Sequence, residues 1–328
     1  MFLCQERFLY FCSIMRVIDS IRNSNGPVFS FELLPPPKGK GIDSLYKSID
    51  LLREFDPKYI NITTHHSEYI FKEMGNGTFE RKTLRRRPGT VAVAAAIQNK
   101  YGISVVPHIL SNGFTPEETE NVIIDLQFLG ITNLLLLRGD KDKSGVPTVG
   151  GYAHATDLER QINDFNNGVF VDGSNMEMKE TPFAYGVACY PEKHEEAPNI
   201  DEDVYWLKKK VELGAQYAVT QLFYDNNKYF EFVDKVRKAG IDIPIIPGLK
   251  PMRKLSQLTV IPQTFKVDLP EALTHEIMKC ETDEQVEAVG TEWCINQCKE
   301  LIQFGVPGLH FYALGAAKSV RTVAQSIF

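Results

Sequence analysis

Polar side chains that could perform acid–base or binding chemistry recur along this sequence, each within or just after a short apolar run. Glu32 is the most unusual, because it lies inside the run FSFELLPP. A carboxyl group among apolar neighbours should have a raised pKa and could act as a general acid near neutral pH. The other interpretation is a structural ion pair between Glu32 and Arg138, and spacing alone does not separate the two.

Asp140 follows Arg138 and Gly139, and a glycine there would let the backbone approach a ligand closely. Asp140 could instead be a turn residue that caps the next helix. Lys250 ends a later apolar run and is a candidate nucleophile that could form a Schiff base with a carbonyl substrate. A lone histidine such as His108 is more often a hydrogen-bonded core residue than a metal ligand, so we expect no metal site.

Other polar groups stand at comparable positions in later runs. These are Thr63, Thr64, Tyr190, Glu192, His194, Gln221, Asp225 and Tyr312. Lys208, Lys209 and Lys210 form a basic run on a predicted helix. That run is either a solvated helix face or a grip on the pyrophosphate of a dinucleotide.

The elements that must position these groups are short β-branched or apolar runs separated by helical patterns. Eight such runs are expected to be strands, at residues 28–34, 59–64, 105–110, 133–138, 184–190, 217–224, 243–249 and 309–314. Eight strands alternating with helices predict a parallel sheet closed as a single-domain (β/α)₈ TIM barrel. In such barrels the catalytic groups lie at the carboxyl ends of the strands, which is where the polar residues above stand.

Composition excludes several classes of protein. The 328 residues carry a formal net charge of −6, with 43% hydrophobic and 24% charged residues, so a nucleic-acid-binding surface is not expected. The one dense basic run, residues 81–87, is interpreted as a solvated loop or helix face, with local anion binding as the alternative. No apolar stretch approaches the ~20 residues of a membrane span, and no secretory signal is recognisable. We therefore expect a cytoplasmic protein.

Two segments and the cysteines complete the predictions from composition. Residues 1–14 are expected to be a non-native or disordered extension, so that the barrel occupies residues 15–328. Residues 166–181 look like an inserted hairpin or loop. The six cysteines do not form a secreted-type disulfide framework, and Cys294 and Cys298 are expected to be buried reduced thiols rather than a metal pair.

Taken in order, these motifs resemble one known family. The segments FSFELLPP, NITT, PHIL, LLLLRGD, ACYPEKHEEA, TQLFYD, IIPGLKP and HFYALG are similar to those of methylenetetrahydrofolate reductases, and they cover nearly the whole chain. The length resembles the bacterial form, which consists of the catalytic domain only. The resemblance implies a barrel that binds FAD. It also implies that NADH or NADPH reduces the flavin and that the flavin N5 hydride then reduces 5,10-methylene- to 5-methyltetrahydrofolate, in a ping-pong cycle. A homo-oligomer is implied as well.

The resemblance also implies roles for individual residues. Glu32 matches the general acid that helps protonate the folate N10, and Asp140 matches an aspartate that contacts the pterin and tunes the flavin. Gln221 and Gln257 match folate contacts. The positions that match FAD contacts are Thr63, His108, Arg138, Gly139, Asp140, Ala155, Tyr190, His194, Ala197, Asp203, Lys209 and Lys210.

The chain departs from the family pattern at four places. Thr64, His65 and His66 follow Thr63 where Tyr-Gly-Ala is usual, and Trp206 replaces an asparagine near the adenosine part of the flavin. An arginine linked to folate is Ala316 here, and a stacking aromatic residue is Ile261. Two other functions remain open, namely a Schiff-base lyase or aldolase that uses Lys250 and a non-catalytic flavin or folate binder.

Overall fold

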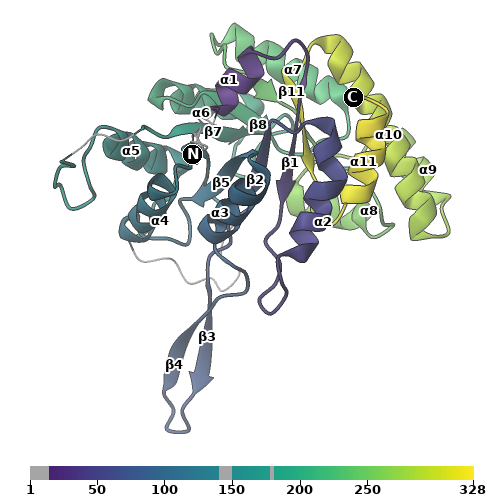
Figure 1. Ribbon diagram of the computed structural model, residues 1–328. Coiled ribbons are helices and arrows are strands. Elements are labelled where there is room, and N and C mark those ends of the chain that lie inside the picture. Colours follow the sequence, from purple (N-terminus) through teal and green to yellow (C-terminus); the bar gives the residue numbers. More distant parts are fainter. Residues whose placement is uncertain (1–14, 140–149, 178–180) are drawn as a thin grey trace, which may run out of the picture.

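Parallel strands surrounded by helices form the body of the molecule (Figure 1). The structure is a computed structural model that describes residues 15–139, 150–177 and 181–328. Residues 1–14, expected to be an extension, and Asp140 lie outside the described residues. The strands of the barrel are β1 (Val28–Leu33), β2 (Tyr59–Ile62), β5 (Ser104–Leu110), β6 (Asn133–Leu137), β7 (Ala184–Cys189), β8 (Tyr217–Thr220), β9 (Ile245–Ile246), β10 (Gly248–Leu249) and β11 (Gly308–Tyr312).

The seventh predicted strand is split into β9 and β10, and this split is the point at which the barrel closes. β9 pairs with β8, whereas β10 pairs with β11, which in turn pairs with β1. Pro247 lies between the two halves and has no N–H to donate to the ladder, but its carbonyl oxygen accepts from the N–H of His310 at 3.0 Å. The predicted α/β barrel of eight strand positions in a single domain is therefore confirmed.

The sixth predicted strand is too long by four residues. β8 ends at Thr220, whereas residues 217–224 were expected to be extended. Leu222 and Tyr224 leave the barrel wall and pack with Met252, Ile261 and other apolar residues in a separate cluster. The apolar run therefore continues past the strand because it serves two cores.

Helices follow the strands and cover the outside of the barrel. They are α2 (Asp43–Leu52), α3 (Thr90–Tyr101), α4 (Pro116–Phe128), α5 (Ala155–Asn166), α6 (Ile200–Leu213), α7 (Asn226–Lys238), α8 (Gln257–Phe265), α9 (Glu271–Met278), α10 (Asp283–Phe304) and α11 (Ala317–Gln325). Outward-facing strand residues such as Phe29 and Phe31 pack with helix residues such as Ile49 and Leu52 in the main core. The long segment after β10 is thus largely helical.

The short helix α1 (Val17–Arg22) packs against the interior of the barrel. Its Val17 and Ile21 share a buried cluster with Val28, Tyr59 and other inward-facing residues. The N–H of Val17 donates to Oδ1 of Asn133 at 3.0 Å, and Asn133 is the first residue of β6. Because α1 fills this end of the barrel, a ligand would bind at the opposite end, where the strands have their carboxyl termini.

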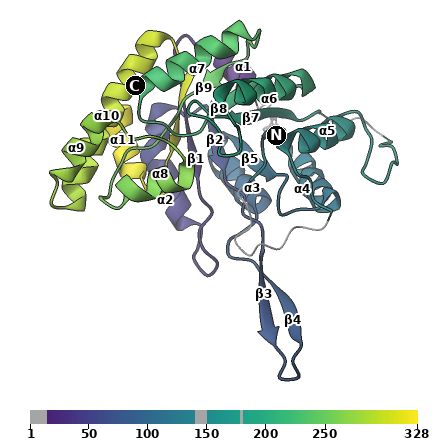
Figure 2. The same ribbon diagram turned by 180° about the vertical axis from the view of Figure 1, so that it is seen from behind.

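A two-stranded antiparallel hairpin, β3 (Glu68–Glu73) and β4 (Phe79–Leu84), was not predicted. It leaves the barrel after β2 and projects well beyond the helices, as two opposite views show (Figures 1 and 2). The basic run that was expected on a loop or helix begins on β4, with Arg81 and Lys82. Arg81 and Lys82 are exposed on this strand, whereas Arg85, Arg86 and Arg87 follow it on a loop, so the expected type of element is wrong only for the first two residues of the run.

The remaining predictions concern the insertion, the cysteines and membrane spans. In the insertion Val169 and Asn175 form an antiparallel bridge, which agrees with a hairpin-like turn. Cys189, Cys294 and Cys298 are buried free thiols. Within the described ranges no three potential metal-binding side chains cluster, and none of the helices there is long and apolar enough to cross a membrane.

Candidate active site at the carboxyl end of the barrel

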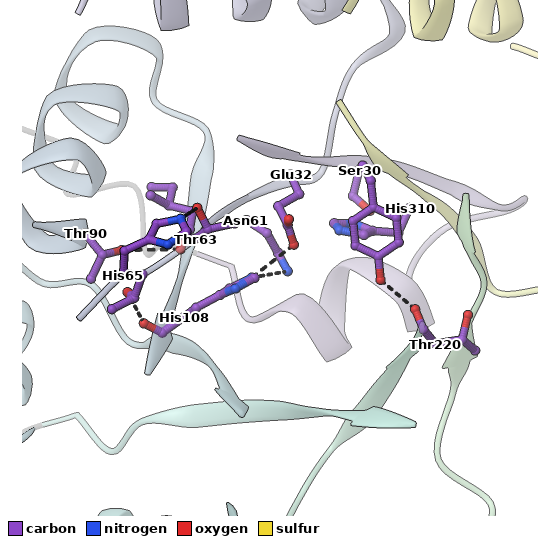
Figure 3. Close-up of polar contacts among 12 residues, drawn as sticks. Ser30, Glu32, Asn61, Thr63, His65, Thr90, His108, Thr220 and His310 are labelled. Carbon is purple, nitrogen blue, oxygen red and sulfur yellow. Dashed lines mark hydrogen bonds and ion pairs between the residues drawn. The ribbon is translucent and has the colours of Figure 1, made fainter. Parts of the chain in front are cut away.

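Glu32, Asn61 and His108 meet inside the barrel near the carboxyl ends of β1, β2 and β5 (Figure 3). The parallel register aligns Glu32 with Asn61 and Asn61 with Val106, two residues before His108. Nε2 of His108 lies 3.4 Å from Oε2 of Glu32 and 3.3 Å from Nδ2 of Asn61. All three residues are buried. Their strands alternate between outward and inward positions, so these polar residues point into the barrel.

Burial suppresses the charge of both titratable groups in this trio. Burial raises the pKa of Glu32 to about 8, although the nearby charge of Lys250 lowers it. Burial lowers the pKa of His108 to about 3, and the charge of His65 acts in the same direction. At neutral pH a protonated carboxyl group therefore faces a neutral imidazole, and the contact is one between two uncharged groups rather than an ion pair. A carboxyl that keeps its proton at pH 7 can act as a general acid.

The structure does not support a Glu32–Arg138 pair. Arg138 lies just beyond β6, and its carboxylate partners among the described residues are Glu195, at 3.7 Å, and Glu196. Both glutamates belong to the segment after β7, so the alternative that Glu32 forms a structural ion pair with Arg138 is wrong in this structure.

A second group of polar residues lies next to this trio in the barrel interior, and of its members only Tyr312 was singled out from the sequence. Oγ of Ser30 is 2.9 Å from Nδ1 of His310, whose ring stacks on Tyr59 with centroids 6.1 Å apart. The Tyr312 hydroxyl donates to the carbonyl oxygen of Thr220 at 2.6 Å. Polar residues at alternate positions of β1 and β11 were the available signal, because alternate residues share the inner face.

Some buried polar atoms in this interior have no hydrogen-bond partner within the described chain. They include Oδ1 of Asn61, Nε2 of His310 and the hydroxyl groups of Tyr59 and Tyr217. Unsatisfied polar atoms are rare in protein interiors and favour water or ligand in the barrel.

A second set of predicted residues gathers around His194. Nε2 of His194 is 3.5 Å from the Arg138 guanidinium, and its ring packs edge-to-face on Tyr190 with centroids 4.7 Å apart. The backbone N–H of His194 donates to Oδ2 of Asp203 at 2.9 Å, and the N–H of Ala197 donates to the His194 carbonyl at 3.0 Å. Burial and the charge of Arg138 lower the pKa of His194. The sequence therefore identified residues that the fold brings together.

The two predicted lysines of α6 point in different directions. Nζ of Lys210 donates to the carbonyl oxygen of Ala188 on β7 at 3.1 Å, and burial lowers the pKa of Lys210. Lys209 instead pairs with Glu212 on its own helix at 2.7 Å, and its side chain is 41% exposed. Only Lys210 is directed toward the barrel.

Three further predicted residues are held by local contacts. Thr63 follows β2, and its Oγ1 lies 3.5 Å from Nε2 of His65. Ala155 begins α5 and is buried. Gly139 has φ +87°, and a Cβ atom there would lie 3.3 Å from the Leu110 side chain. A left-handed backbone next to a buried side chain explains a glycine at that position.

The two predicted glutamines already have partners. Oε1 of Gln221 accepts from the N–H of Leu222 at 2.8 Å. Oε1 of Gln257 accepts from the N–H groups of Arg253 and Lys254, at 2.6 and 2.9 Å. A ligand would have to use their side-chain amide nitrogens or displace these contacts.

Lys250, the candidate nucleophile, follows β10. Burial lowers its pKa, and the nearby Glu32 carboxyl acts against that shift. Lys250 and Glu32 are therefore close enough for each to shift the pKa of the other.

Comparison with known proteins agrees with this architecture. The family model described as methylenetetrahydrofolate reductase matches residues 17–327. The chain is 30% identical over 303 residues to methylenetetrahydrofolate reductase 1 of Schizosaccharomyces pombe, covering 91% of this chain and 45% of the relative. It is 28% identical over 300 residues to 5,10-methylenetetrahydrofolate reductase of Escherichia coli, covering 91% and 90%.

The chain therefore spans about half the length of the fungal and plant relatives. A solved structure, described as an uncharacterized protein from Clostridium thermocellum that binds two copies of 5-methyl-5,6,7,8-tetrahydrofolic acid, has a TM-score of 0.56 and 14% identity. The aligned region covers 94% of this chain and 97% of the solved chain, and the similarity supports the barrel fold. With a family model that matches nearly its whole length, the chain belongs to the methylenetetrahydrofolate reductase family.

Proposed function

We propose that this protein reduces 5,10-methylenetetrahydrofolate to 5-methyltetrahydrofolate, with FAD as its cofactor and NADH or NADPH as the electron source. The observation that carries the proposal is Glu32. A buried carboxyl with a pKa of about 8 stands near the carboxyl end of β1, in a chain of this family.

Glu32 would supply the proton that the folate needs. The methylene bridge of the substrate accepts a hydride only after its ring opens, and opening requires protonation of N10. A carboxyl group that is already protonated at pH 7 can deliver that proton directly, without first taking one up from solvent. The neutral imidazole of His108, 3.4 Å away, would orient the carboxyl group.

The residues around His194 fit a flavin dinucleotide. Arg138 is a planar guanidinium donor, and Lys210 is a buried ammonium group, and both types bind phosphate oxygens well. Gly139 leaves room for close approach next to Leu110. Bound FAD would supply the hydride chemistry, which no side chain provides. Arg138, Tyr190, His194, Asp203 and Lys210 are the residues proposed to hold it, together with Thr63, His108, Gly139, Ala155 and Ala197.

The decisive experiment separates the two half-reactions. The purified protein should show a flavin absorbance spectrum that bleaches anaerobically with NADH or NADPH and returns on addition of methylenetetrahydrofolate. A protein that is colourless, takes up no added FAD and reduces no folate would refute the proposal. Comparing the two nicotinamides in the same experiment identifies the electron donor.

A further inference from the structure

The hairpin of β3 and β4 forms a separate sheet that does not pair with the described strands of the barrel. In the described part of the chain, β3 pairs only with β4, and the sheet has two strands. An isolated two-stranded hairpin is at best marginally stable in water. Large apolar side chains on it are nevertheless exposed, with Ile70 at 42%, Phe71 at 54% and Phe79 at 63%. The hairpin projects away from the barrel in both views, so the barrel does not cover it (Figures 1 and 2).

The two outer edges of the hairpin differ in their ability to pair with a copy of themselves. Two identical strands that pair antiparallel about a two-fold axis place one residue opposite its own copy and its neighbours opposite each other in reverse order. On β4 each register centred on Glu80, Arg81 or Lys82 places that charged residue opposite its own copy, although the register centred on Arg81 also places Glu80 opposite Lys82 on each side. Like charges directly opposite are destabilising. The β4 edge is therefore less suited to self-pairing than an edge whose central pair is apolar.

On β3 one register is self-complementary. When Ile70 lies on the axis, it faces the Ile70 of the second copy, and Glu68 faces Lys72 twice, once on each side. All three residues share one face of the hairpin, because alternate residues of a strand point to the same side. Apolar and opposite-charge pairs across strands both stabilise a sheet.

We propose that β3 pairs antiparallel with β3 of a second copy of this chain, centred on Ile70. The product is a four-stranded sheet with the order β4-β3-β3-β4, in which the basic residues Arg81 and Lys82 lie on the outer strands. The exposed aromatic side chains Phe71 and Phe79 come from the opposite face of the hairpin and are diagonal neighbours there, since Phe79 is aligned with Glu73, two residues from Phe71. This arrangement gives the hairpin the additional strands that its stability requires.

Charge reversal tests the register directly. In the full-length protein, Glu68→Lys places two lysines opposite each other at both of these cross-strand pairs, and Lys72→Glu places two glutamates there. Sedimentation velocity should show each variant dissociating at a protein concentration about tenfold or more above that at which the wild type dissociates. The double variant Glu68→Lys/Lys72→Glu should associate again. A mixture of the two single variants should associate more tightly than either variant alone, because both cross-strand pairs in the mixed dimer then join a lysine to a glutamate.

Lys82→Glu is the matched control, because it makes the same charge change on β4, about two strand spacings (~10 Å) from the partner strand. It should leave association unchanged. A monomeric wild type, an oligomer that neither single variant weakens, a double variant that fails to associate, or a control that dissociates as readily as the single variants would each overturn the proposal. Circular dichroism spectra and melting curves confirm that the variants fold.

Discussion

Nε2 of His108 lies 3.4 Å from Oε2 of Glu32, and burial leaves both groups uncharged at neutral pH. An ion pair at this place would hold the carboxyl group ionised and useless as an acid. The barrel interior instead raises the pKa of Glu32 to about 8, because no formal positive charge from His108 opposes the cost of burial. The pair thus favours a proton donor that is ready at physiological pH.

The first prediction concerns Glu32→Gln. Glutamine keeps the shape and a hydrogen-bonding group but has no acidic proton, so reduction of methylenetetrahydrofolate should fall by about 10²-fold or more. Reduction of bound flavin by the nicotinamide needs no such proton and should stay within a few-fold of wild type. Anaerobic stopped-flow measurement of each half-reaction tests this. Equal losses in both half-reactions would show that Glu32 is not the acid.

The second prediction concerns stability, and its sign follows from the raised pKa of Glu32. The folded state binds this proton more tightly than the unfolded state, so the stabilisation is complete below pH 4.5 and is lost as pH rises to about 8. Glu32→Gln removes the titration. The variant should be more stable than wild type at pH 8–9, by an amount on the order of 4–5 kcal/mol, and the gain should shrink toward pH 5.

Urea unfolding of the two proteins across this pH range measures the difference. If the difference in free energy of unfolding between wild type and variant stayed constant from pH 5 to pH 9, the pKa of Glu32 would not be raised.

The eight strand positions were predictable because strands buried on both faces read as nearly continuous apolar runs. The hairpin was not, because β3 and β4 are exposed and carry six charged side chains, so they show no buried face. The strand ends were also blurred. The run after β8 stays apolar because Leu222 and Tyr224 enter a second core, and a sequence does not say which core an apolar residue joins.

In the site, Glu32 stood out because a charged residue inside an apolar strand is rare. Its partner was harder to predict. Arg138 follows β6 and turns toward Glu195 and Glu196, whereas His108 lies on β5 and reaches Glu32 of β1 across the intervening strand β2. Contacts between strands depend on strand register, which the order of residues along the chain does not specify.

The third prediction separates the reductase from a Schiff-base enzyme. The positive charge of Lys250 lowers the pKa of Glu32, so Lys250→Met should raise that pKa. The folate half-reaction should then keep its rate to higher pH than in wild type. Borohydride should trap no carbonyl compound on wild-type protein. Covalent labelling at Lys250, together with loss of all activity in Lys250→Met, would favour the lyase or aldolase instead.

The fourth prediction compares the two adjacent lysines of α6. Lys210 is buried against Ala188, whereas Lys209 pairs with Glu212 on the exposed side of the helix. Lys210→Met should therefore weaken FAD binding by about tenfold or more, since a charge-assisted hydrogen bond is lost. Lys209→Met, the matched control, should change FAD affinity by less than about twofold, because exposed ion pairs contribute little.

Quenching of flavin fluorescence on titration with apoprotein measures both dissociation constants. The fold should tolerate Lys210→Met because of the state of Glu159, the buried carboxyl whose charge acts most strongly on Lys210. Burial raises the pKa of Glu159 to about 8, so this carboxyl can remain protonated when the lysine is gone. Equal weakening by both substitutions would mean that the net charge of the helix, and not the buried position of Lys210, governs binding. No weakening by Lys210→Met would remove Lys210 from the proposed cofactor site.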